Sequence, residues 1–161
     1  ISDVYFHMGD VTNIASLTAL SDIINTNNRR LDLLVNNAGI IAGGGIEDID
    51  YDNWNNVMNI NVNGVFNCTK VMLPLLKKSD SASIVNISSI SSKIVSSSMA
   101  YSCSKSAVDM MTKCLAKDLA KHNIRVNSIS PGIMKTGFQV NNSIVNEDDY
   151  TNFINKCSWN S

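Results

Sequence analysis

Three short apolar segments, each ending in small or polar residues, restrict the fold of this chain more than any other feature. They lie at 31–35, 84–87 and 124–129 and lead into Asn-Asn-Ala-Gly, Ser-Ser and Ser-Pro-Gly. Stretches with apolar residues at helical spacing separate them, at about 51–77 and 100–121. Strands that alternate with helices form a parallel sheet, and ligands bind such sheets at the carboxyl ends of the strands. We therefore expect an α/β fold with a functional site along that edge.

The remaining segments complete the expected order of elements. Val4–Met8 is rich in β-branched and aromatic residues, which predicts a further strand. A helix over about 13–28 should follow, with Thr12 or Asn13 as its cap. The stretch 31–35 is almost continuously apolar, which is typical of a parallel strand covered on both faces of the sheet.

Tyr101 and Lys105 are the residues that most directly suggest chemistry. Residues four apart project from the same face of a helix, so a phenol and an ammonium should lie side by side. A nearby positive charge favours the phenolate, and we therefore expect Lys105 to lower the pKa of Tyr101. A tyrosine tuned in this way can act as a general acid or base near neutral pH.

Taken together, the motifs resemble those of the short-chain dehydrogenase/reductase family over roughly residues 4–138. The matching residues are Asn36-Asn37-Ala38-Gly39, Asn61 within Asn-Ile-Asn-Val-Asn-Gly, Ser89, Tyr101 with Lys105, and Pro131-Gly132 with Thr136. They occur in the order of the family and at close to its spacing. The resemblance implies a Rossmann-type, doubly wound parallel sheet, with residues 1–161 forming a single, partial NAD(P)-binding domain.

Parts of the family pattern are not recognisable in these 161 residues. A Rossmann domain opens with a strand, a glycine-rich turn and a helix whose N-terminus binds the pyrophosphate. Gly43-Gly44-Gly45 has neither the spacing of that turn nor a helix directly after it, and we interpret it as a loop. The closing end of the fold is also unrecognisable after about residue 140. We expect this chain to be the central and catalytic portion of a longer protein.

The resemblance implies catalytic roles for Asn61, Ser89, Tyr101 and Lys105. Tyr101 would exchange a proton with the substrate, Lys105 would stabilise the phenolate and hold the nicotinamide ribose, and Asn61 would lie in a locally distorted helix. Ser89 would donate a hydrogen bond to the substrate oxygen. Ser88 is its rival, because the serine of the family more often lies thirteen residues before the tyrosine. We prefer Ser89 because it matches the residue that ends the strand in the family.

The resemblance also implies a set of residues that contact NAD or NADP. Asn37, Ala38 and Gly39 would let the cofactor pass close to the backbone, since small residues permit such an approach. The full set implied by the resemblance is Asp10, Val11, Asn37, Ala38, Gly39, Tyr101, Lys105, Pro131, Gly132, Met134 and Thr136. Asp10 could equally be a plain cap beside the following helix.

Composition narrows the classes of partner. The net charge is −1 and basic residues are not clustered, so we expect no binding to nucleic acid, and no apolar run is long enough to predict a membrane span. The four cysteines lack the spacing of a zinc site, and His7 and His122 have no partners at metal spacing, so we expect no metal. Scattered single cysteines favour a reducing, cytoplasmic location.

The sequence thus predicts an oxidoreductase that interconverts a secondary alcohol and a ketone or aldehyde with NAD(H) or NADP(H). The alternative is a non-catalytic α/β remnant that oligomerises and binds no dinucleotide. A flavodoxin-like binding module would leave Tyr101 and Lys105 unexplained. The helices at about 54–76 and 100–121 carry more apolar surface than one sheet face can cover, so we expect a homodimer or homotetramer of the full-length parent.

Overall fold

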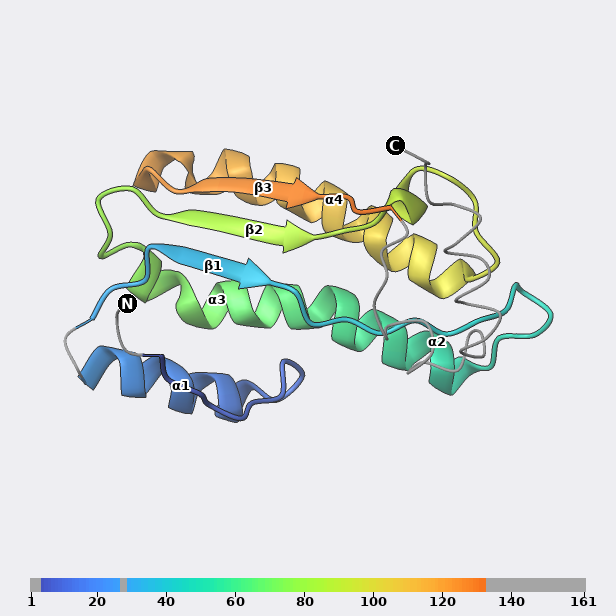
Figure 1. Cartoon of the computed structure of the whole chain (residues 1–161), viewed down its shortest axis with the longest axis horizontal. Helices are drawn as coiled ribbons and strands as arrows, with labels where there is room; N and C mark the ends of the chain where they lie inside the picture. Colours follow the sequence, from blue (N-terminus) through green and yellow to red (C-terminus); the bar gives the residue numbers. More distant parts are fainter. Residues whose placement is uncertain (1–3, 27–28, 133–161) are drawn as a thin grey trace, which may run out of the picture.

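The structure, a computed structural model, describes residues 4–26 and 29–132. Figure 1 shows strands and helices in alternation, with the strands side by side and their arrowheads pointing the same way. The elements in chain order are α1 (Ile14–Thr26), β1 (Leu33–Asn36), α2 (Tyr51–Met58), the π-helix η1 (Asn59–Asn63), α3 (Gly64–Leu76), β2 (Ser83–Ile87), the 3-10 turn η2 (Ile90–Ser92), α4 (Met99–Leu119), the 3-10 turn η3 (Ala120–His122) and β3 (Arg125–Ile129).

The strands form one parallel sheet in the order β1-β2-β3. Asn36 of β1 pairs in register with Asn86 of β2, which pairs with Ser128 of β3. Because the register keeps the carboxyl ends of the strands level, the residues after each strand emerge along one edge. The parallel α/β arrangement expected from the sequence is confirmed.

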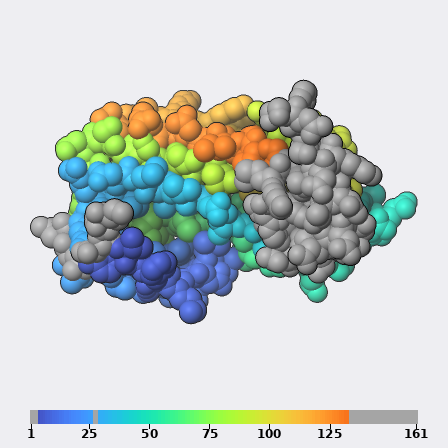
Figure 2. All heavy atoms as spheres, viewed as in Figure 1, coloured from blue at the N-terminus to red at the C-terminus, as the bar shows by residue number. Residues whose placement is uncertain are grey.

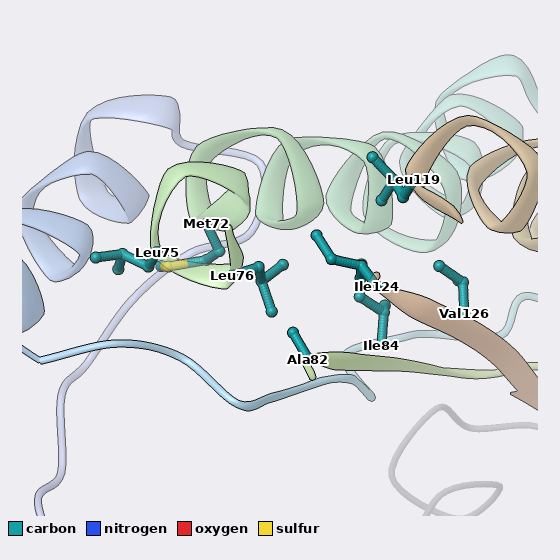
Figure 3. Packing of buried hydrophobic residues seen from close by; sticks show 8 residues of the cluster. All are labelled: Met72, Leu75, Leu76, Ala82, Ile84, Leu119, Ile124 and Val126. Atoms are coloured by element: carbon teal, nitrogen blue, oxygen red, sulfur yellow. The ribbon is translucent and has the colours of Figure 1, made fainter. Parts of the chain in front are cut away.

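The core lies between the sheet and the helices on one of its faces. Its buried apolar side chains come from α3, α4, β2, β3 and the turns beside them, and Figure 3 shows how they meet. These residues are Met72, Leu75, Leu76, Ala82, Ile84, Leu119, Ile124 and Val126. Apolar burial of this kind is the main force that holds α3 and α4 on the sheet.

The opposite face of the sheet corrects one expectation. We expected the strand at 31–35 to be covered on both faces, but Leu33 and Val35 are about half exposed, at 53% and 49%, as is Ile129 of β3, at 53%. Figure 2 views this face and shows the described strands without a described helix over them. The described crossovers all run toward β3, and right-handed crossovers in one direction place their helices on one face.

The segment Val4–Met8 corrects a second expectation, because it forms no strand. Phe6 and Met8 are each 96% exposed. A strand needs a hydrogen-bonded neighbour, and within residues 4–26 and 29–132 none lies beside this segment. In a doubly wound sheet the spatial order of the strands is 3-2-1-4-5-6. Val4–Met8 and β1 would take the places of the third and the fourth strand, which are not adjacent in this order. The amino-acid composition of Val4–Met8 favours a strand, but a strand forms only where a neighbouring strand can pair with it.

The expected helix at 51–77 is interrupted by one wider turn. Asp50 caps α2 by accepting a hydrogen bond from the Asn53 amide at 2.6 Å, and the helix continues through η1 into α3. The Gly64 amide bonds the Asn59 carbonyl, which is the i→i+5 spacing of a π-helix. Asn13 caps α1, accepting from the Ser16 amide at 3.1 Å.

Gly64 should be required by packing rather than by backbone conformation. A Cβ at this position would lie 2.7 Å from Cγ2 of Val11, although its φ of −57° suits any residue. We therefore expect Gly64→Ala to lower the free energy of unfolding by about 1–3 kcal/mol, measured by urea denaturation. Gly45→Ala, where a Cβ meets nothing within 4 Å, is the matched control. Restoring stability by adding Val11→Ala would confirm the cause, and an unchanged Gly64→Ala variant would contradict it.

Candidate active site

The residues singled out in the sequence meet at the carboxyl edge of the sheet and at the start of α4. Ser88 and Ser89 follow β2 directly, and Tyr101 and Lys105 lie in the first two turns of α4. In Figure 1 the beginning of α4, in yellow, lies beyond the arrowheads of β2 and β3. The parallel sheet therefore gathers residues that are far apart in the sequence.

Ser89 and Tyr101 form a hydroxyl pair. A hydrogen bond from the Ser89 side chain lowers the pKa of Tyr101, but burial has the larger effect and raises that pKa above its ordinary value. Ser89 is itself buried, and its Oγ accepts from the Ser91 amide at 3.1 Å, which holds the side chain at the start of η2. The loop after β2 thus aims the Ser89 hydroxyl at the phenol.

The direction of the Tyr101 pKa shift differs from the sequence-based expectation. We expected Lys105 to lower it, but Lys105 Nζ lies 5.5 Å from the centroid of the Tyr101 ring and donates a hydrogen bond elsewhere. Burial penalises the charged phenolate more than the surroundings favour it. In this geometry the tyrosine holds its proton at neutral pH.

Lys105 is buried to an extent that is rare for lysine, with 4% of its surface exposed. Its Nζ donates to the Ile87 carbonyl at the end of β2, at 2.8 Å. Burial lowers the pKa of Lys105 to about 8, and the negative charge of Asp109 opposes that shift. A lysine with such a pKa is still mainly charged at pH 7.

Ser88 occupies a different environment from Ser89. Its hydroxyl donates to the main-chain carbonyl of Lys105 at 3.2 Å, and its amide donates to the Ile129 carbonyl at 2.8 Å. Ser88 therefore faces α4 and β3, whereas Ser89 faces Tyr101.

Asn61 lies fully buried within η1 and joins three segments. Its Oδ1 accepts from the Ile40 amide at 2.8 Å, and its Nδ2 donates to the Ile40 carbonyl and to Ser104 Oγ, each at 2.9 Å. The local helix distortion expected at this asparagine is present as the π-helix. Asn61 thereby fixes the chain after β1 relative to α4.

Gly39 leaves room beside these side chains. A Cβ there would lie 3.3 Å from Asn61 Oδ1 and 3.5 Å from Lys105 Nζ. Asn37 and Ala38 are exposed at the end of β1. These three residues form an open strand end that adjoins the buried lysine.

The other expected cofactor contacts divide into three groups. Asp10 and Val11 lie in the turn before α1, where Asp10 accepts from Thr12 and the Val11 carbonyl accepts from Asn67 of α3 at 3.1 Å. The hydrogen bonds from Thr12 hold the pKa of Asp10 below its usual value, so Asp10 acts as a local turn acceptor.

Pro131 and Gly132 stand at the end of β3. The Pro131 carbonyl accepts from the Ile90 amide at 3.0 Å, and a Cβ on Gly132 would meet nothing within 4 Å. This end of the sheet is therefore tied to the Ser89 loop, and Gly132 is exposed. Met134 and Thr136 lie outside the described residues.

Several residues that shape the site were given no role by the sequence analysis. Asn36 and Asn86 are buried and share a side-chain hydrogen bond at 2.8 Å, and Asp109 accepts from Ser92 at 2.6 Å. Asparagine inside an apolar strand, as at Asn86, is the signal that could have identified the first pair. Asp109, one turn after Lys105, has the appearance of an ordinary surface charge in sequence.

The described residues hold neither a membrane-spanning helix nor a cluster of metal ligands. Among the residues that the structure describes, no helix is both long and apolar enough to cross a membrane. The same residues contain no group of three or more histidine, cysteine or acidic side chains placed to hold a metal ion.

Known proteins that are similar to this chain belong to one family. The model of the short chain dehydrogenase family matches residues 2–146. Cyclopentanol dehydrogenase from a Comamonas species is 41% identical over 133 residues, which cover 82% of this chain and 53% of that enzyme. Trans-4-hydroxycyclohexanecarboxylate dehydrogenase from Sinomonas cyclohexanicum is 40% identical over 134 residues, covering 83% of this chain and 51% of that enzyme.

The fold comparison agrees with the sequence comparison. A gluconate 5-dehydrogenase from Burkholderia cenocepacia, solved with NADP and tartrate, superposes with a TM-score of 0.80 at 28% identity, over 91% of this chain and 57% of that one. This confirms the expected Rossmann-type fold. The chain spans about half the length of the relatives that it matches. By sequence and by fold, it belongs to the short-chain dehydrogenase/reductase family.

Proposed function

We propose that the protein carrying this chain is an oxidoreductase that interconverts a secondary alcohol and a ketone or aldehyde, using NAD(H) or NADP(H). One observation carries the proposal: the Ser89 and Tyr101 hydroxyls are paired at the open edge of the sheet, with the buried Lys105 ammonium beneath the phenol. In this proposal residues 1–161 are one part of the NAD(P)-binding domain.

Tyr101 would be the proton donor in carbonyl reduction and the proton acceptor in alcohol oxidation. Because burial raises its pKa, Tyr101 carries its proton at neutral pH and can give it to an oxygen that gains negative charge. The Ser89 hydroxyl would donate a second hydrogen bond to that oxygen. The two donors would act on one substrate atom.

Lys105 would stabilise the phenolate that Tyr101 becomes. Its ammonium is within 5.5 Å of the ring, and the low polarity of a buried site strengthens the attraction between the two charges. Asn61 would keep the chain after β1 in place beside Lys105. Since the pKa of Lys105 is about 8, the ammonium is lost as the pH rises through that value, and carbonyl reduction should slow there.

The described residues fit the nicotinamide half of the cofactor. Gly39 brings the backbone close to Lys105 Nζ, Ala38 and Gly132 are exposed at the ends of β1 and β3, and Lys105 can donate to a ribose hydroxyl. A bound dinucleotide would supply the hydride for the reaction. The pyrophosphate requires other groups, because no glycine-rich turn is present in the sequence given.

The names of the relatives suggest where to search for the substrate. Two of them are named for a cyclic secondary alcohol and for a hydroxylated cyclohexane carboxylate. We therefore propose small cyclic secondary alcohols and their ketones as the first compounds to assay. The three described cysteines, Cys68, Cys103 and Cys114, are free, in keeping with the proposed reducing, cytoplasmic compartment.

Removing the phenolic hydroxyl should abolish turnover. In the full-length protein, we expect Tyr101→Phe to reduce kcat by at least about 10²-fold, since the proton donor is lost, with the Kd for NAD(H) or NADP(H) within about threefold of wild type because no charge changes. Steady-state kinetics and fluorescence titration measure these quantities. Tyr51→Phe, at a side chain that is 88% exposed, is the control. Turnover by Tyr101→Phe at the wild-type rate would exclude the proposed role, and an inactive wild type would favour the non-catalytic alternative.

The two serines should respond differently to replacement. We expect Ser89→Ala to lower kcat by about 10²-fold, because the second donor to the substrate oxygen is removed. Ser88→Ala should keep kcat near wild type but lower the free energy of unfolding by about 1 kcal/mol, since its hydroxyl bonds the Lys105 carbonyl. Parallel kinetics and urea denaturation separate the effects. The reverse pattern would assign the role to Ser88.

The outer faces of α3 and α4 should form a contact between subunits. Phe66 on α3 and Met110 on α4 are 53% and 58% exposed. Exposed large apolar side chains on neighbouring helices are typical of a surface that binds another subunit. We expect the full-length protein to sediment as a dimer or tetramer at micromolar concentration, and Phe66→Glu with Met110→Glu to shift it toward monomer. Glu at Ile94, an exposed apolar residue of the loop after η2, provides the control. A wild type that sediments only as monomer would refute the expectation.

A further inference from the structure

Asp109 lies on α4 one helical turn after Lys105 and faces the loop that carries Ser89. Its Oδ2 accepts a hydrogen bond from Ser92 Oγ at 2.6 Å, and Ser92 also accepts, through its carbonyl, from Ser106 Oγ at 2.9 Å. Ser92 ends η2, the turn that Ser89 caps. Two side chains of α4 therefore hold the far end of the turn that begins at Ser89.

Asp109 is partly buried, and hydroxyl groups surround its carboxylate. The hydroxyls of Ser92, Ser88 and Ser128 and the charge of Lys93 lower its pKa, against the opposing and larger single effect of burial. Within the described part of the chain, its buried Oδ1 has no hydrogen bond of normal geometry. The next residue, Met110, is 58% exposed, so α4 turns its outer face away at this level.

We propose that Asp109 is a positioning residue that ties the loop from Ser88 to Lys93 to α4 and thereby holds Ser89 opposite Tyr101. This inference rests on the proposed function, because it gives Ser89 and Tyr101 their roles. Asp109 touches neither hydroxyl directly. It acts through Ser92, which fixes η2, and η2 in turn fixes the serine at its start.

The same carboxylate acts on Lys105 through its charge. Burial lowers the pKa of Lys105 to about 8, and Asp109 is the group that opposes this. Among the described residues, Lys105 also faces Tyr101 on the same helix and the Ile87 carbonyl of β2, which carry no full charge in this state. Lys93, from the loop after η2, faces Asp109 from the other side. Asp109 therefore keeps the ammonium present at a higher pH than burial alone would allow.

Two substitutions separate the tie from the charge. Asp109→Asn keeps an oxygen that can accept from Ser92 but removes the charge, whereas Asp109→Ala removes both. Asp109→Glu restores the charge and serves as the conservative variant. Asp118→Asn removes an exposed acidic charge from the same helix and is the matched control.

The effect of the charge is measured without turnover. In full-length protein with ¹³C-labelled lysine, the Cε resonance of Lys105, assigned from its absence in Lys105→Arg, reports the titration of its ammonium. We expect Asp109→Asn to lower the midpoint by about one pH unit, the order of the shift that one nearby opposite charge causes. Asp109→Glu should lie closer to wild type, and Asp118→Asn should leave the midpoint unchanged. An unchanged midpoint in Asp109→Asn would overturn the electrostatic part.

The tie is measured by kinetics on the full-length protein. We expect Asp109→Ala to lower kcat about tenfold at pH 7, and Ser92→Ala, which removes the donor from the other side, to do the same. The double variant should fall no further than Asp109→Ala alone, because Ser92→Ala breaks the same connection and adds no further loss. Asp109→Asn should retain kcat at pH 7 within about threefold. The alkaline limb of its pH–rate profile should begin at a lower pH than in the wild type. If Asp109→Ala fails to fold, Ser92→Ala carries the test.

The outcomes distinguish the two proposals. A wild type without turnover refutes the proposed function, while the Lys105 titration still tests the charge of Asp109. A wild type that turns over, with Tyr101→Phe inactive and with both Ser92→Ala and Asp109→Ala at wild-type kcat, refutes the positioning role alone. Additive losses in the double variant would also refute it.

Discussion

Two asparagine side chains hold the carboxyl ends of β1 and β2 together inside the protein. Asn36 donates to Asn86 Oδ1 at 2.8 Å and to Thr69 of α3 at 3.2 Å, and Asn86 donates to Thr112 of α4 at 2.8 Å. Leaving one of these buried groups without a partner would cost about 1–3 kcal/mol. A one-residue slip of either strand would break the whole chain of bonds. The site depends on it, because Asn37 and Ser88 leave the sheet within two residues of these asparagines.

The π-helix provides the second constraint. An asparagine in a regular helix competes for main-chain hydrogen bonds and is disfavoured there. In η1 the wider turn lets Asn61 reach Ile40 with both its oxygen and its nitrogen and still meet Ser104. The amide chain of Asn36 and Asn86 sets where the strands end, and Asn61 sets where the chain goes after β1. Lys105 adjoins both segments, because its Nζ donates to the Ile87 carbonyl, one residue after Asn86, and lies beside Gly39, one residue before Ile40.

Much of this arrangement could be predicted from the sequence, and the failures have physical causes. Strand ends followed by small or polar residues, and Tyr101 four residues before Lys105, are local patterns, so the edge of the sheet and the start of α4 were predictable. Val4–Met8 failed as a strand because pairing depends on a neighbour, not on composition. The direction of the Tyr101 pKa shift failed because burial depends on the whole fold. Asp109 was missed because its partner Ser92 is distant in sequence.

Burial shifts the pKa values of Tyr101 and Lys105 in opposite directions, and the proposed chemistry follows from these shifts. Burial favours the neutral form of each group, raising the pKa of the phenol and lowering that of the ammonium. Once Tyr101 gives up its proton, the new phenolate faces the Lys105 charge across the same poorly polar space, where attraction between charges is strongest. The titrations of the two groups are then coupled, so the pKa of Lys105 is higher while Tyr101 is a phenolate than while it is a phenol. The site thus disfavours ionisation of Tyr101 at rest and stabilises the phenolate once the proton has been transferred. The carboxylate of Asp109 sets the range of pH over which Lys105 is charged during that transfer.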